Sequence, residues 1–337
     1  MENPIPILGH NKIISFLQRL IKLNKQGQTL TGSYIFAGPS NLGKKTALFW
    51  FIQSLLCERL NNEGQPCKKC QTCQQVKLKI WPDIHIINRE QGKKNISIEQ
   101  IREMIKKLSM SSFLDNYKIG IIHEAETLSI SAANSLLKLL EEPNQKVLIF
   151  LLANNPEDLP LTVVSRSQVL QFRPIQAGLI YDYLVHTHKV KRSIAKNLSQ
   201  FVAGRPGLAL DFLKDQDKLD MHLRTARLLL ESMGQDINYR LQGLYELVGN
   251  AKGQKAVDNA SAVLDSWQNI TRDLLMLKYD QADLVQHQAL IKELEEKKDK
   301  QSLNKLLYLQ KQLIQAKQYL AANVNPKLTL EHIIINI

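Results

Sequence analysis

Long apolar runs are absent from this 337-residue sequence, and none of its hydrophobic stretches approaches the length that a membrane-spanning helix needs. The first residues, Met-Glu-Asn-Pro-Ile-Pro, also lack the basic region and apolar core of a secretion signal. No internal repeat is present. We therefore expect a cytoplasmic protein that does not enter a membrane. Its content of 44% hydrophobic and 23% charged residues is that of an ordinary globular protein with room for two or three domains.

Cysteine is scarce, and four clustered cysteines argue against a disulfide framework. The four cysteines lie close together in the pattern Cys57-x9-Cys67-x2-Cys70-x2-Cys73. In a reducing compartment such a cluster favours a metal site over disulfides, and four thiolates complete the tetrahedral shell of zinc. Because no coordination position stays open, the predicted zinc is structural rather than catalytic. Four unrelated buried thiols, or a redox group, are the alternatives.

The net charge of +12 points toward polyanions without identifying one. A basic protein is attracted to nucleic acid, the commonest polyanion of the cytoplasm. Lysine-rich genomes, however, also encode many basic proteins that touch no DNA. Charge alone therefore leaves contact with nucleic acid open.

Apolar stretches of strand length alternate with helical patterns in the first half of the chain. Strands are predicted at residues 34–37, 83–87, 118–122, 147–153 and 169–172, and helices at residues 10–26, 48–55, 97–108 and 129–142. This alternation predicts a parallel α/β sheet. The stretch at 147–153 is apolar throughout, so we expect it to be buried on both faces.

Strand signals end after Pro174. Residues 176–213 have the pattern of short helices, interrupted by Gly-Arg-Pro-Gly at 204–207, and residues 214–337 have that of long amphipathic helices without a chemical motif. We predict three domains: residues 1–175, with the metal module at 57–73, then residues 176–213, then residues 214–337.

A glycine-rich turn follows the first predicted strand and opens a helix, as in a phosphate-binding loop. Gly38, Gly43 and Lys44 have the spacing with which backbone N–H groups wrap phosphates while a lysine reaches the outer ones. The next position normally holds a Ser or Thr that binds Mg²⁺, but here it is Lys45. Thr46 comes one residue late, and one residue turns a helical side chain by about 100°, so it cannot substitute. The alternative is a tight turn with a surface lysine.

The predicted strand at 118–122 leads into a second altered site. An apolar strand that ends in two acidic residues can offer one carboxylate to Mg²⁺ and the next as a general base. His123 stands where the metal-binding Asp would be, and Glu124 where the base would be. Imidazole is a poor ligand for Mg²⁺, which prefers oxygen. Both altered positions argue against conventional binding of ATP with Mg²⁺; two polar residues at a strand end, without a chemical role, are the alternative.

Ser165-Arg166 follows the strand predicted at 147–153 and a proline-containing loop. An arginine on the rim of such a fold can reach the γ-phosphate held by a neighbouring subunit, as an arginine finger does. Taken alone, the pair indicates only an exposed arginine.

The motifs and their order resemble those of the AAA+ clamp-loader subunits of bacterial DNA polymerase III. The most specific block is Ala-Ala-Asn-Ser-Leu-Leu-Lys-Leu-Leu-Glu-Glu-Pro at residues 132–143, and the resemblance runs from residue 7 to the C-terminal segment at 325–331. It implies a RecA-like AAA+ domain, a small helical lid and an all-α C-terminal collar. It also implies a hetero-pentamer with gamma/tau-type ATPase subunits and a delta-type subunit, which loads a sliding clamp onto primed DNA.

Three departures indicate which subunit type this chain resembles. Lys45, His123 and Gly207 stand where the ATPase subunits carry Ser or Thr, Asp and Arg, and all three match the delta-prime type. The resemblance then implies little or no ATPase activity of its own, with Arg166 acting in trans, although Ser167 replaces the family's Cys. Asn154 matches a phosphate-sensing position. An active ATPase subunit that uses Lys44 and Glu124 is the alternative, and a zinc-dependent nucleic-acid-binding module is a third possibility.

Overall fold

The computed structural model describes residues 7–61, 64–90, 92–110, 116–143 and 146–337. It divides into two compact units, one made of residues up to 189 with 204–207, the other of residues 190–203 and 208–337. The predicted division at 175 and 213 into three domains is a different one and stays a prediction.

A five-stranded parallel sheet with strand order β2-β3-β4-β1-β5 forms the centre of the first unit. The strands are β1 (Gly32–Ala37), β2 (Ile84–Ile87), β3 (Lys118–Ile122), β4 (Val147–Ala153) and β5 (Gln168–Gln171). All five predicted strands are present; β3 and β4 have the predicted bounds, and the bounds of the other three differ by one or two residues. Every residue of β4 is buried, as its uninterrupted apolar sequence predicts.

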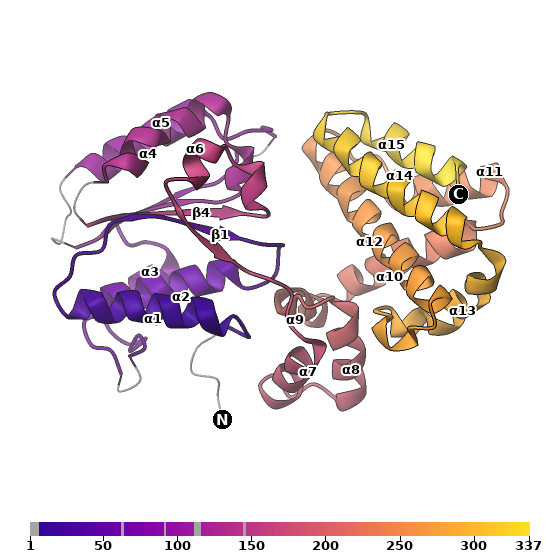
Figure 1. Ribbon diagram of the computed structural model, residues 1–337, viewed down its shortest axis with the longest axis horizontal. Coiled ribbons are helices and arrows are strands. Elements are labelled where there is room, and N and C mark those ends of the chain that lie inside the picture. The colour runs from indigo at the N-terminus through magenta and orange to yellow at the C-terminus, as the bar shows by residue number, and fades with distance from the viewer. Residues whose placement is uncertain (1–6, 62–63, 91, 111–115, 144–145) are drawn as a thin grey trace. The chain divides into compact units, whose positions relative to one another are not determined.

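Helices cover both faces of this sheet (Figure 1). The covering helices are α1 (Asn11–Lys25), α2 (Lys44–Leu56), α3 (Gln71–Leu78), α4 (Ile98–Ser109), α5 (Ile130–Glu141) and α6 (Leu161–Val164). The unit also contains α7 (Ala177–His186) and the short 3-10 turns η1 (Ala125–Thr127) and η2 (Pro156–Asp158). One hydrophobic core joins α1, α2 and α3 to the sheet, and another joins α4 and α5 to it. The fold is therefore a three-layer α/β domain.

Local signals explain two of these helices. Ser97 caps α4 in a complete capping box, in which its hydroxyl accepts from the Gln100 N–H and the Gln100 side chain accepts from the Ser97 N–H. Ser129 caps α5 in the same position. The predicted helix at 129–142 ends one residue earlier, at Glu141, because Glu142 precedes Pro143 and leaves helical geometry.

The second unit is wholly helical among its described residues. Its helices are α8 (Arg192–Phe201), most of α9 (Pro206–Lys214), α10 (Gln216–Ser232), α11 (Ile237–Val248), α12 (Gln254–Lys278), α13 (Ile291–Lys300), α14 (Leu303–Ala321) and α15 (Pro326–Ile335), with η3 (Ala282–Leu284) and η4 (Gln288–Leu290). Helix α12 lies centrally, and its Trp267 is fully buried and donates to the Thr225 carbonyl at 3.0 Å. Across the described chain, no helix is long and apolar enough to span a bilayer.

Candidate nucleotide and metal sites of a clamp-loader subunit

The glycine-rich loop joins β1 to α2, and its backbone has the positive φ angles of a phosphate-binding loop. Gly38, Asn41 and Gly43 all have positive φ, at 141°, 67° and 89°. Such residues turn successive N–H groups into one concave surface at the start of the helix. A Cβ on Gly38 would collide with the carbonyl of Phe172, so only glycine fits there.

Lys44 is held over this loop by carbonyl groups. Its ammonium donates to the carbonyls of Gly38, of Pro39 at 3.3 Å and of Ala153 at 2.9 Å. Burial lowers the pKa of Lys44 to about 8, an effect that the nearby Glu126 carboxylate partly offsets. Lys44, the predicted lysine of the loop, therefore lies where a bound anion would contact its ammonium group.

The two positions that would hold Mg²⁺ have no Mg²⁺ ligand. Lys45 and Thr46 are exposed on the first turn of α2. His123, directly after β3, is only 7% exposed, and neither ring nitrogen has a hydrogen-bond partner. Burial lowers the pKa of His123 to about 4, with smaller effects from the ammonium groups of Lys45 and Lys79. Its imidazole is therefore neutral at physiological pH.

Glu124 and Asn154 have partners that the sequence did not reveal. Glu124, with φ at 50°, forms an ion pair with Arg89 at 2.9 Å. The Asn154 amide donates to Glu126 at 2.7 Å, and its oxygen accepts from the Ser40 hydroxyl at 3.4 Å. Asn154 thus links Glu126 to Ser40 of the phosphate loop, and burial raises the pKa of the Glu126 carboxyl. Neither Arg89 nor Glu126 had a predicted role: Arg89 follows the strand predicted at 83–87, and Glu126 is the last residue of the His-Glu-Ala-Glu segment at 123–126.

Gly207 contacts the same loop. Its N–H donates to the Asn41 carbonyl at 2.9 Å. A Cβ at this position would lie 2.9 Å from that oxygen, so this contact requires glycine. The arginine that the ATPase subunits are expected to carry here would not fit this arrangement.

The four cysteines form a compact cluster at the far end of α2. Their Sγ atoms all lie within 4.8 Å of one another, and those of Cys67 and Cys73 are 4.0 Å apart. Sulfurs around a tetrahedral zinc lie roughly 3.8 Å apart, given Zn–S bonds of about 2.3 Å. The donors therefore fit the predicted metal, and the four cysteines can bind a metal such as zinc. Cys57, directly after α2, is separated from Lys44 by about 20 Å of helix.

Backbone N–H groups point at three of these sulfurs. Cys67 donates to the Cys57 Sγ at 3.3 Å, Cys70 to the Cys67 Sγ at 3.3 Å, and Cys73 to the Cys70 Sγ at 3.4 Å. Such bonds stabilise negative charge on sulfur, and the N–H of Cys70 contributes most to lowering the pKa of Cys67 to about 6. Burial instead raises the pKa of Cys73. The N–H bonds therefore favour the thiolate form, which a metal requires, at Cys67, whereas burial opposes it at Cys73.

Arg166 lies just after α6, with 35% of its side chain exposed. Its guanidinium binds Glu141 through two bonds of 2.7 and 2.6 Å and donates to the Thr162 carbonyl at 3.0 Å. The Ser33 hydroxyl of β1 donates to the Arg166 carbonyl at 2.7 Å and pairs with the Ser167 hydroxyl at 2.9 Å. The backbone of the predicted finger is therefore fixed to the sheet.

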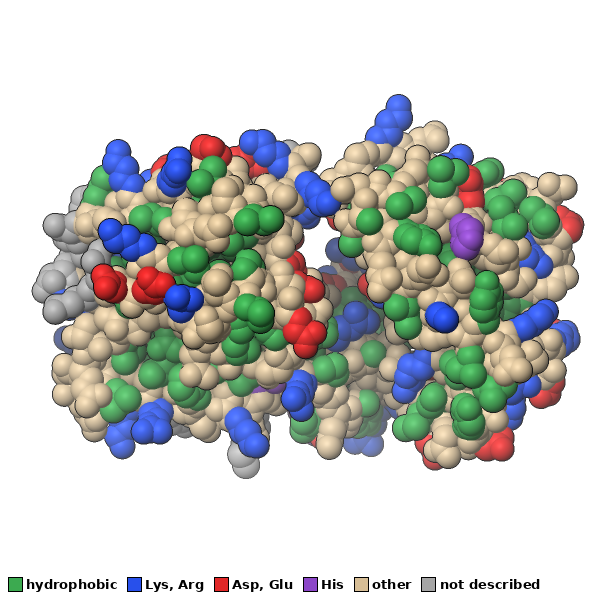
Figure 2. Space-filling model, turned by 45° about the horizontal axis from the view of Figure 1, so that its top comes forward, with side chains coloured by type: hydrophobic (Ala, Val, Ile, Leu, Met, Phe, Trp, Pro, Cys, Tyr) green, Lys and Arg blue, Asp and Glu red, His purple; other side chains and the backbone are tan. Residues whose placement is uncertain are grey.

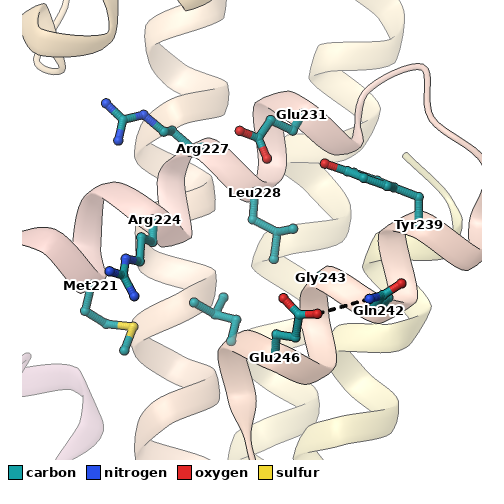
Figure 3. Close-up of a pocket in the computed structure, with 10 residues that line it drawn as sticks. Met221, Arg224, Arg227, Leu228, Glu231, Tyr239, Gln242, Gly243 and Glu246 are labelled. Atoms are coloured by element: carbon teal, nitrogen blue, oxygen red, sulfur yellow. Dashed lines mark hydrogen bonds between the residues drawn. The ribbon is translucent and has the colours of Figure 1, made fainter.

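The second unit contains a buried pair in which His287 Nδ1 lies 2.7 Å from Asp273 Oδ2, and it has a groove between α10 and α11 (Figure 3). The cavity measures about 390 Å³. Its lining includes Met221, Arg224, Leu228, Tyr239, Gly243 and Glu246. Gly243 opens this groove, because a Cβ there would overlap Leu228. We call it the α10/α11 groove.

Comparison with known proteins identifies the same family that these motifs resemble. A family model described as "DNA polymerase III, delta subunit" matches residues 9–176. The chain is 24% identical to DNA polymerase III subunit delta' of Bacillus subtilis strain 168 over 350 aligned residues, covering 96% of each chain. The chain belongs to the delta-prime family of DNA polymerase III. A delta-prime subunit is a component of the clamp loader, so the chain acts in DNA replication.

Two further relatives match about half of this chain or less. The chain is 31% identical to subunit delta' of Pseudomonas aeruginosa over 134 residues, or 40% of each chain. It is 30% identical to subunit tau of Bacillus subtilis over 174 residues, which is 52% of this chain and 30% of tau. The delta-prime match from Bacillus subtilis, in contrast, extends through both units. The predicted roles of the individual site residues stay predictions.

Proposed function

We propose that this delta-prime subunit helps to load the sliding clamp onto primed DNA without hydrolysing ATP itself, and that it completes the ATP site of a neighbouring subunit with Arg166. The proposal rests on a contrast between two sites of this chain: the groups that would hold Mg²⁺ are lost, whereas the arginine finger is kept. Lys45 and the neutral His123 have replaced the groups that would hold Mg²⁺, while Arg166 is retained on a backbone fixed to β1. A subunit that acts in trans needs the arginine finger but does not need a catalytic metal of its own.

The partners follow from the family. We infer a hetero-pentamer with ATPase subunits of the gamma/tau type and a delta-type subunit, which acts on the sliding clamp and on primed DNA as part of the DNA polymerase III holoenzyme. Figure 2 shows the Lys and Arg side chains of one face scattered over both units rather than gathered in one patch. The DNA-contacting residues are therefore not singled out by charge on that face.

The zinc is proposed to be structural. With all four ligands supplied by cysteine, the metal would have no open position for a substrate. Cys57 ends α2, and Cys70 caps α3, so one ion would fix the connection between these helices. Its binding free energy would then contribute to the local folding of residues 57–73.

Residues 214–337 of the second unit are proposed to form the collar through which the subunits associate. Met221 and Tyr239 at the α10/α11 groove are about half exposed, and both residue types are enriched in protein interfaces. The residues at 176–213 are proposed to form the small lid.

Arg166→Ala in the assembled clamp loader tests the trans role. We expect the ATP site that this chain completes to lose on the order of 10³-fold in turnover, because the developing charge on the γ-phosphate loses its counter-charge. Steady-state ATP hydrolysis by the loader measures the effect, and size-exclusion chromatography should show normal assembly. Arg173→Ala, an exposed arginine of the same unit, is the matched control. Unchanged hydrolysis with Arg166→Ala would rule out this role.

A further inference from the structure

Glu141 is the side chain that holds the guanidinium of Arg166. Its Oε1 accepts from the Nε of Arg166 at 2.7 Å and pairs with Nη2 at 2.6 Å, so it occupies the side edge of the planar group. The third nitrogen, Nη1, donates to the Thr162 carbonyl at 3.0 Å. All three nitrogens therefore have partners on α5 and α6, and these partners fix the direction of the side chain.

The same contacts leave the tip of the guanidinium available. Each η nitrogen carries two N–H groups, and the five donors of the group form a rigid fork. While one N–H of Nη2 points at Glu141, the other points past the end of the side chain, away from that carboxylate. The Arg166 side chain is 35% exposed, so its tip can contact an anion that another subunit brings.

Glu141 lies at a position that its own helix does not favour. It is the last residue of α5, and the carboxyl end of a helix carries a partial negative charge. The helix dipole repels a carboxylate there, so helix stability alone argues against this residue. The guanidinium of Arg166, 25 residues further along the chain, supplies the compensating charge. Local rules of this kind are most often broken at functional sites.

We propose that Glu141 is a positioning residue, which holds Arg166 by its side edge so that its tip is directed at the γ-phosphate in a neighbouring subunit. This inference rests on the proposed function, because Glu141 acts only through Arg166. Arginine has a long flexible stem, and a misplacement of about 1 Å can lower a rate on the order of 100-fold. Ser33 fixes the backbone of Arg166 to β1, and Glu141 fixes the other end of the side chain.

Steady-state ATP hydrolysis by the assembled clamp loader tests this role. The Arg166-dependent turnover is the difference between the wild type and Arg166→Ala. Glu141→Ala should lower this part by about tenfold with little change in KM, because the finger acts in the transition state. Glu141→Gln should keep more of it, since its amide oxygen still accepts a hydrogen bond. Glu142→Ala, at the exposed next residue, removes the same charge and should match the wild type.

Two further measurements separate positioning from a structural role. In the Arg166→Ala background, Glu141→Ala should cause no further loss of turnover, because the side chain that it positions is gone. The melting temperature of the full chain alone should stay the same or rise with Glu141→Ala, since an exposed ion pair contributes little and the repulsion at the end of α5 is removed. A further loss in the Arg166→Ala background, or a lower melting temperature, would make Glu141 structural and overturn the proposal.

The results for Glu141 and Arg166 together show which idea fails. Turnover in Glu141→Ala that equals the wild type would overturn the positioning role. Higher turnover would overturn it too, since Glu141 would then hold Arg166 back from the phosphate. If only Arg166→Ala lowers turnover, this inference fails while the proposed function stands. If Arg166→Ala itself has no effect, the proposed function fails and the inference fails with it.

Discussion

At the scale of single residues, His123 makes the stability of the fold depend on pH. Its pKa is lowered to about 4 in the folded chain, mainly by burial, whereas an unfolded chain protonates histidine near pH 6.5. Between these values the unfolded state binds more protons, so the free energy of unfolding falls as the pH drops from about 6.5 toward 4. We expect His123→Asn to reduce this loss, as measured by urea unfolding at pH 7 and pH 5.

The control for this prediction is an exposed histidine in the same unit, His186 of α7. His186→Asn should leave the difference in unfolding free energy between pH 7 and pH 5 unchanged. An equal loss of stability in wild type and His123→Asn would contradict the burial argument for His123.

Residue types and spacing predicted the chemistry of this site but not its contacts. Gly38, Lys44 and the four cysteines have fixed spacing along the chain, and the structure places them in the predicted loop and in one cluster. The pairing of Arg89 with Glu124 depends on β2 lying beside β3. Because the order of strands in a sheet is a tertiary property, no local pattern specified that pair.

At the scale of elements, the helices that local sequence defines were predicted, and those that tertiary contacts define were missed. Helix α4 has a strong amphipathic period and a capping box, so local sequence defines it. Helix α3 has eight residues and little periodicity, and it was not predicted. It starts at Cys70, whose sulfur accepts from the Cys73 N–H, and its Val76 packs in the core. The cysteine cluster and packing, rather than propensity, define this helix.

Removing one ligand therefore tests how far the metal holds this element. We expect Cys70→Ser to release about one zinc per chain and to loosen residues 57–73 while the sheet stays folded, since the sheet has its own cores. Metal analysis and hydrogen exchange measure the two effects. Lys69→Ala changes a neighbouring residue that is not a ligand and should retain the metal. A wild-type chain without zinc, or a Cys70→Ser chain whose sheet also unfolds, would contradict this prediction.

At the scale of the whole molecule, the sequence predicted a change from α/β to all-helical structure but not the position of every division. The end of strand signals after Pro174 marks the end of the sheet, because β5 finishes at Gln171. The compact units divide elsewhere, since residues 204–207 belong with the sheet through the bond from Gly207 to Asn41, whereas residues 190–203 pack in the helical unit. Such long-range contacts leave no local signal in composition.

The helical unit has no chemical motif, so its proposed function in assembly must be tested on its surface. Met221 lies at the α10/α11 groove with 51% of its surface exposed, and burying the exposed half of such a side chain contributes about 0.8–1.5 kcal/mol, half of the value for full burial. We expect Met221→Glu to weaken association with the other loader subunits by about tenfold or more, measured by calorimetry, without changing the melting temperature. Leu284→Glu is the matched control, because Leu284 is also 51% exposed but lies on η3, outside the lining of the groove. Equal affinities for both variants would place the subunit contact elsewhere, whereas a selective loss with Met221→Glu would identify the groove as a docking surface of the collar.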